Sequence, residues 1–224
     1  MTNVFALFDT RDAAQAAVRS LVDGGLPAER ISVAATGAGE TLVETEVHED
    51  GNLAAEGASA GISSGALVGG TLGVLAGLGL GAVSLGPLVL AGPLAGLLTG
   101  AAAGAATGGL VGALIGMGIP ETEADTYAES IRRGGVLVSA HVDDATVEHV
   151  ETVLDGHGAI DVGHRHEQYR HDGFVKFDPA SPPLTDAEQA AERARIQAGG
   201  TSPAEAGYNA DEAPTRRVRR YPAP

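Results

Sequence analysis

PETEADTYAESIRRGGVLVSAHVDD, Pro120 to Asp144, carries the signals for a helix, a strand and the start of another helix. A proline at the first helical position, followed by three acidic residues, suits the positive end of a helix dipole. Two arginines then precede Gly134-Gly135, which predicts that the helix ends there. The apolar run Val136–Val142 predicts a buried strand. Asp143 or Asp144 predicts the cap of the next helix.

The pattern continues downstream of this stretch. Apolar residues at helical spacing predict a helix that ends near Gly156, and its buried face consists of Val147, Val150, Val153 and Leu154. Ile160–His166 then predicts a last strand.

A matching pattern opens the chain. Asn3–Asp9 predicts a buried strand, Asp9 or Thr10 a helix cap, and Ile31–Ala35 a second strand after Gly24-Gly25. We therefore expect an α/β (α+β) fold with a small four-stranded sheet, helices on one face, and the order β-α-β, insert, α-β-α-β.

A long apolar insert separates the two halves. From Gly57 to Pro120, 64 residues contain no charged residue, no histidine and no aromatic residue. Four segments follow from this. Residues 1–56 form the first half of the domain and 120–171 the second half. Residues 57–119 form an apolar helical hairpin, and 172–224 a Pro/Ala/Gly-rich tail that we expect to be mostly disordered, apart from a helix over Asp186–Ala198.

Glycine recurs at every fourth position in both arms of the insert, with a turn expected near Ser84–Pro87. The first series is Gly57, Gly61, Gly65, Gly69, Gly73, Gly77 and Gly81; the second is Gly92, Gly96, Gly100, Gly104, Gly108, Gly112 and Gly116. Glycine is about 1 kcal/mol worse than alanine in a helix, but small residues four apart let helix backbones approach closely. We therefore predict a glycine zipper, a set of helix-packing surfaces that favours homo-oligomers.

Each arm is long enough to span a bilayer, since about 20 apolar residues suffice. We expect two transmembrane helices in contact with membrane lipid, with domain and tail in the cytoplasm, because the N-terminus lacks the features of a secretory signal. The alternatives are a cytoplasmic homo-oligomer that buries the hairpin, and reversible insertion under stress. The missing aromatic belt and the absence of flanking lysine or arginine argue for these alternatives.

The arrangement resembles a bacterial general stress protein family with a heat-induced stress protein YflT-like domain. The resemblance covers roughly residues 3–166, and GIPETEADTYAESIRRGGVLV is its most specific part. It implies stress-linked expression and a small α/β domain that carries a glycine-rich hairpin. It implies no activity, substrate or catalytic residue.

Composition and motifs exclude several kinds of site. A net charge of −15 excludes general nucleic-acid binding, and the lack of cysteine excludes disulfides and thiolate sites. No phosphate-loop or nucleophile-elbow motif is present. His164 and His166, on one face of the predicted strand, and His171 are interpreted as a solvated strand end rather than a metal site.

The tail contains a basic cluster in an otherwise acidic chain: Arg216, Arg217, Arg219 and Arg220. These arginines are candidates for contact with anionic lipid or a partner, or with the acidic domain of the same chain.

We expect a non-enzymatic stress-response membrane protein with a structural or membrane-stabilising role. We expect no cofactor, catalytic residue, metal or small-molecule substrate. A pore and a small-ligand-sensing module are the alternatives.

Overall fold

The computed structural model describes residues 1–36, 82–85, 88–91, 105–199 and 217–222. Within these ranges the fold is α+β, built on an antiparallel sheet of six strands in the order β3-β4-β2-β5-β1-β6. The strands are β1 (Thr2–Phe8), β2 (Ile31–Thr36), β3 (Ala82–Leu85), β4 (Leu88–Ala91), β5 (Val136–Val142) and β6 (Arg219–Pro222). The expectation of an α+β sheet is confirmed, while the expectation of four strands is wrong.

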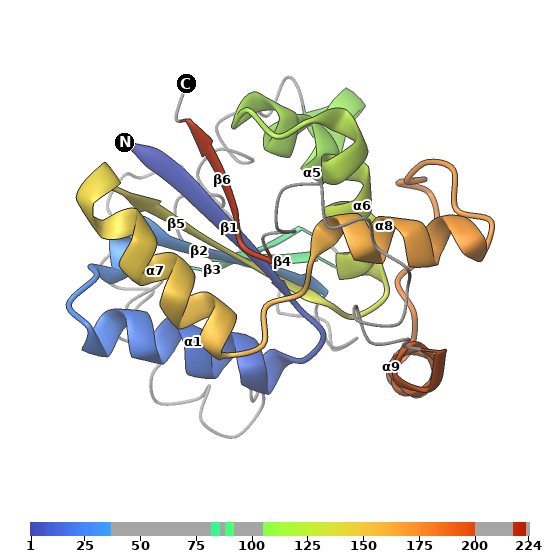
Figure 1. Cartoon of the computed structure of the whole chain (residues 1–224). Helices are drawn as coiled ribbons and strands as arrows, with labels where there is room; N and C mark the ends of the chain where they lie inside the picture. Colours follow the sequence, from blue (N-terminus) through green and yellow to red (C-terminus); the bar gives the residue numbers. More distant parts are fainter. Residues whose placement is uncertain (37–81, 86–87, 92–104, 200–216, 223–224) are drawn as a thin grey trace, which may run out of the picture.

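Helices cover both faces of the sheet, not one as predicted (Figure 1). The helices are α1 (Arg11–Asp23), α5 (Ala105–Gly116), α6 (Glu121–Arg132), α7 (Asp144–Gly156), α8 (Val162–His171) and α9 (Asp186–Gly199), with a short 3-10 turn at Ala28–Arg30. Helices α1 and α7 pack on one face. Helices α5, α6 and α8 contribute to the core on the other face.

Alternation along β1 explains the two cores. Val4, Ala6 and Phe8 point toward α1 and α7, whereas Phe5 and Leu7 point toward α5 and α6. Because all five side chains are at most 1 % exposed, β1 is buried on both faces. A strand buried on both faces has a continuous apolar sequence rather than an alternating one.

The regular elements near Pro120–Asp144 lie where the sequence predicts them. Helix α6 begins after Pro120, and β5 spans the predicted Val136–Val142. Asp143 caps α7, although without a side-chain hydrogen bond. Thr10 caps α1, since its side chain accepts a hydrogen bond from the Ala13 amide.

The predicted last strand, Ile160–His166, is wrong. Only Ile160 bridges to Leu7, and the chain then enters α8. The Asp161 side chain accepts a hydrogen bond from the His164 amide at 2.8 Å, which makes Asp161 a helix cap. The buried residues of this helix, Val162, Arg165 and Tyr169, follow helical rather than strand spacing.

The predicted helical hairpin is wrong around its turn, where Ala82–Leu85 and Leu88–Ala91 are strands, whereas Ala105–Gly116 of the predicted second arm is helical. The chain does reverse between Leu85 and Leu88, but between two strands, and β4 pairs with β2. Runs rich in valine and leucine favour a strand when a neighbouring edge can accept their hydrogen bonds. Gly57–Gly81 and Gly92–Gly104 lie outside the described residues.

The end of the apolar insert belongs to the domain core. Leu110 and Leu114 of α5 pack on the second face of the sheet, and the helix is interrupted at Gly109, whose φ is +50°. Among the described helices, none is both long and apolar enough to cross a membrane.

The tail contributes two regular elements to the described part of the chain. Helix α9 extends the predicted Asp186–Ala198 by one residue, and β6 pairs with β1. The predicted helix is therefore confirmed, whereas Arg219–Pro222 forms a strand where the sequence predicted disorder.

Candidate functional site

The outer surface of α5 presents the described members of the second glycine series. Gly112 and Gly116 are exposed and lie beside Ile115, which is 43 % exposed. Among the described residues no atom lies within 4 Å of a Cβ added at either glycine. The described part of the domain therefore does not require a small residue at either position. Side chains of Ala105–Gly108 are outside the described set.

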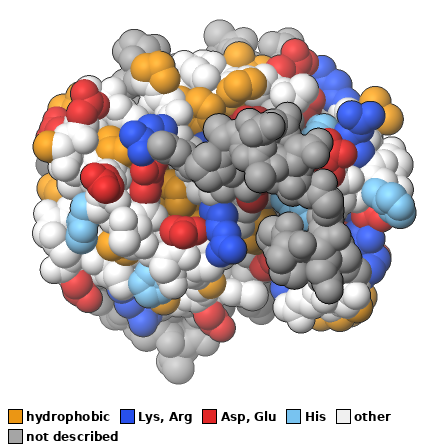
Figure 2. Space-filling model, viewed as in Figure 1, with side chains coloured by type: hydrophobic (Ala, Val, Ile, Leu, Met, Phe, Trp, Pro, Cys, Tyr) orange, Lys and Arg blue, Asp and Glu red, His pale blue; other side chains and the backbone are white. Residues whose placement is uncertain are grey.

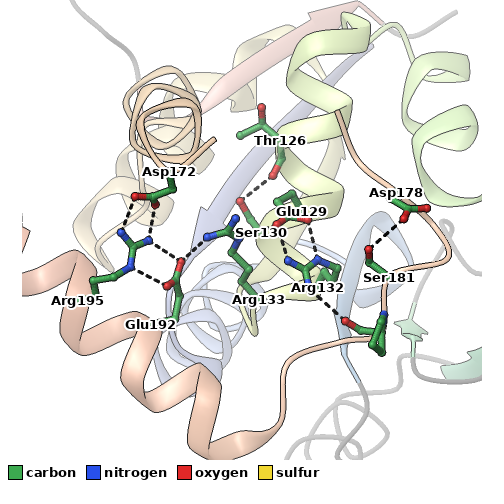
Figure 3. A network of polar contacts seen from close by, with 11 residues as sticks. Thr126, Glu129, Ser130, Arg132, Arg133, Asp172, Asp178, Ser181, Glu192 and Arg195 are labelled. Carbon is green, nitrogen blue, oxygen red and sulfur yellow. Dashed lines mark hydrogen bonds and ion pairs between the residues drawn. The ribbon is translucent and has the colours of Figure 1, made fainter. Parts of the chain in front are cut away.

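A second group of residues lies where the end of α6 meets α9 (Figure 3). Glu129 is 4 % exposed and accepts hydrogen bonds from both neighbouring arginines. Arg132 binds both Glu129 oxygens at 2.7 Å, and Arg133 donates from Nε to one of them at 2.6 Å. Because the buried carboxylate has two charged donors, the cost of its burial is offset.

Helix α9 is attached to this group through Glu192. Its carboxylate accepts a hydrogen bond from Arg133 at 2.7 Å and two from Arg195, whose guanidinium also binds Asp172. The hydrogen bonds from Arg195, with a further contribution from Arg133, lower the pKa of Glu192 to about 2. A chain of alternating charges thus joins α6, α8 and α9 (Figure 3).

A small cavity lies beneath Glu192. Arg133 and Arg165 both face the ring of Tyr169, at 4.2 and 5.8 Å from the ring centre. The cavity between them has room for about one water molecule. Arg165 is 4 % exposed and pairs with Asp9 at 2.8 Å, but its Nε has no partner among the described residues. Burial raises the pKa of the Tyr169 hydroxyl.

The basic cluster of the tail lies against the acidic surface of its own domain. Arg220 binds Glu151 with two hydrogen bonds of 2.6 Å. Arg217 lies 3.8 Å from Asp155, and Arg219 lies 4.0 Å from Asp161. Arg216 is outside the described residues. On the face drawn in Figure 2, acidic and basic side chains lie intermixed.

The histidines do not form the arrangement that a strand predicts. In a helix, His164 and His166 are about 200° apart and point in different directions. His164 contacts Gln168, and the His166 Nδ1 lies 2.8 Å from the Thr126 hydroxyl. Over the ranges that the structure describes, no three His, Cys, Asp or Glu side chains are grouped as metal ligands would be.

The sequence does not predict the contact between one serine and one histidine, because the two residues lie 137 positions apart. Ser20 Oγ and His157 Nε2 lie 2.8 Å apart and join α1 to α7. A catalytic triad needs a third group that orients the histidine, and within the described ranges no contact of this kind to His157 is present. We interpret the pair as a link between the two helices.

Comparison with known proteins adds no family. No family model matches the chain, and no curated protein or solved structure matches it either.

Proposed function

We propose that this chain is a non-enzymatic protein that assembles with copies of itself at a membrane through the glycine-rich segment. The resemblance to the general stress protein family adds a role in the stress response, structural or membrane-stabilising in kind. The observation that carries the proposal is the outward position of Gly112 and Gly116 on α5.

The support for this proposal is geometric. A glycine that makes room for the domain's own packing has neighbours around its Cα, as Gly135 does with the Ser130 carbonyl oxygen. Gly112 and Gly116 have none among the described residues, yet they continue a series of seven at the same spacing. Small residues four apart suit close contact between helices. The exposed Ile115 adds apolar area to the same surface.

Replacing both glycines by leucine tests the assembly. Gly112→Leu/Gly116→Leu is expected to reduce oligomers seen by chemical cross-linking and by light scattering in detergent. Gly156→Leu is the matched control, because Gly156 is also an exposed helical glycine with open space around it. Unchanged oligomers in the double variant would refute the assembly surface.

Cell fractionation tests the membrane part separately. If the chain resists carbonate extraction and needs detergent, the membrane proposal is supported. If it is released by carbonate as a large particle, the glycine surfaces bury against each other outside a bilayer.

The pocket of Arg133 and Arg165 favours a second candidate, a module that senses small anionic ligands. Glu192 places a carboxylate against Arg133, and Arg133 and Arg165 both face the ring of Tyr169. A small carboxylate or phosphate offers the same chemistry. Because the cavity alone has room for about one water molecule, such an anion would have to displace the Glu192 side chain from Arg133. A thermal-shift screen with such anions tests it: a concentration-dependent rise in melting temperature, larger in Glu192→Gln, supports sensing, and no rise with any anion refutes it.

A further inference from the structure

The C-terminal strand β6 fills a groove along the edge of β1. The two strands pair antiparallel, with Thr2 opposite Pro222 and Phe5 opposite Arg219. Without β6 the backbone groups along this side of β1 have no strand partner, because β5 occupies the other side. Such an open edge accepts an extended peptide of matching chemistry.

Two apolar anchors hold the segment, one in each core. Val218 is 4 % exposed and belongs to the core beneath α1 and α7. Tyr221 is 9 % exposed and belongs to the core beneath α5 and α6. Its ring meets Phe5 edge-on at 5.6 Å between centroids, and its hydroxyl donates to Glu123. The segment is therefore bound through both faces of the sheet.

Acidic residues line the groove beside the two anchors. Glu151 and Asp155 lie on α7, and Asp161 caps α8. They pair with Arg220, Arg217 and Arg219 in that order. The groove thus selects an extended peptide with an apolar residue, two arginines and a tyrosine in sequence, which is Val218–Tyr221.

The length of the connection limits how far the segment can reach. Residues 200–216 lie between α9 and Arg217, and 17 residues span at most about 60 Å when extended. Every contact of β6 described above is made by residues from Arg217 onward. The contacts of Arg217–Pro222 with the groove are the same whether this segment belongs to the same chain or to another copy.

We propose that β6 is exchanged between copies, so that the C-terminal strand of one copy completes the sheet of a second. The occupant of the groove is then Arg217–Pro222 of the second copy. Exchange of a terminal element is a low-cost route to association, because all native contacts are kept. Four of the 14 basic residues lie in the tail cluster, against 29 acidic residues in the chain. Electrostatic attraction between the basic segment of one copy and the acidic surface of another therefore assists their association. The proposal does not depend on the glycine surface.

Cysteine cross-linking of the purified full-length chain tests the exchange. The chain has no cysteine, so introduced thiols are the sole ones. Thr2→Cys and Pro222→Cys lie opposite each other on β1 and β6. Directly opposed residues of an antiparallel pair lie about 4.5–5.5 Å apart at Cα, within the range of a disulfide. The double variant is expected to form this disulfide whether β6 lies on its own chain or on a second copy, so it serves as the control that the pair can close.

Mixing the two single variants decides the question. Thr2→Cys copies mixed with tagged Pro222→Cys copies are expected to form cross-linked pairs at least tenfold above a mixture of Thr2→Cys with Val175→Cys. Val175 is 89 % exposed and reports random collisions. Arg220→Glu on the tagged copy should lower the yield at least threefold, and Glu151→Arg on the other copy should restore it. If pairs form no faster than with Val175→Cys, while the double variant closes fully, β6 stays on its own chain and the proposal is wrong.

Discussion

Glu192→Gln tests how strongly α9 is held to the domain. The carboxylate of Glu192 bridges Arg133 and Arg195, and its side chain is 12 % exposed. Its pKa is lowered from 4.5 to about 2. A tenfold change in proton affinity corresponds to about 1.4 kcal/mol, so the lowered pKa stabilises the folded form by at most about 3.5 kcal/mol. Because 47 % of the Arg195 side chain is exposed and solvent screens the pair, we expect about 1–2 kcal/mol.

The pH dependence has a definite sign. A carboxylate with a lowered pKa stabilises the folded form above its unfolded pKa of about 4.5, and the contribution disappears as pH falls toward 2. Glu192→Gln should therefore be less stable than the parent at pH 7. The difference should shrink between about pH 4.5 and pH 2.

Hydrogen exchange and urea unfolding measure this effect together. Exchange of the amides of Asp186–Gly199 should be about 5–30-fold faster in Glu192→Gln at pH 7, the factor that corresponds to 1–2 kcal/mol. Glu167→Gln, an exposed carboxylate on α8, is the control. Equal exchange in the parent and Glu192→Gln at pH 7, or a difference that persists unchanged at pH 2, would refute the reasoning.

Three further predictions address the core, a backbone position and alkaline pH. Leu114→Ala should lower the free energy of unfolding in urea by about 2–5 kcal/mol, whereas Ile115→Ala should lower it by less than about 1 kcal/mol. The reason is that Leu114 is fully buried and Ile115 is 43 % exposed. Similar losses in the two variants would contradict the packing of α5. Gly134→Ala should speed hydrogen exchange in α9, since an added Cβ meets the Gln189 side chain. Gly173→Ala is the control, because Gly173 has a similar positive φ and open space around it, and it should leave exchange in α9 unchanged. Equal exchange rates in the two variants would show that φ alone matters. Burial raises the pKa of the Tyr127 hydroxyl well above 10, so the free energy of unfolding falls as pH rises above the unfolded pKa of about 10. Tyr127→Phe should make this decrease shallower in urea titrations at pH 9–12. An unchanged dependence on pH would contradict the burial of this hydroxyl.

Local signals predicted the elements whose structure is decided locally. Pro120, Gly134-Gly135 and Asp143 set the bounds of α6, β5 and α7, and the structure agrees with each. The cap at Asp161 is also local, but the sequence predicted a strand over Ile160–His166. The Asp161 side chain instead accepts a hydrogen bond from the His164 amide and begins a helix.

Elements and contacts that depend on partners far away in the sequence could not be predicted. The residues Leu88–Ala91 are a strand because β2 offers an edge, 52 to 58 residues earlier in the chain. The segment Arg219–Pro222 is a strand because β1 offers another, over 200 residues away. Neither edge can be read from the sequence beside these segments. The contact of Glu192 with Arg133, separated by 59 residues, is unpredictable for the same reason.

The pairing of β1 with β6 has a consequence for the synthesis of the protein. The strand β1 is synthesised about 220 residues before its partner β6, because Thr2 pairs with Pro222. At about 5–20 residues per second, this interval takes roughly 11–44 s to translate. During this time one edge of β1 has no strand partner, and a nascent chain that stops before Arg219 keeps that edge open. Termination before β6 is therefore expected to yield chains that aggregate through the edge of β1.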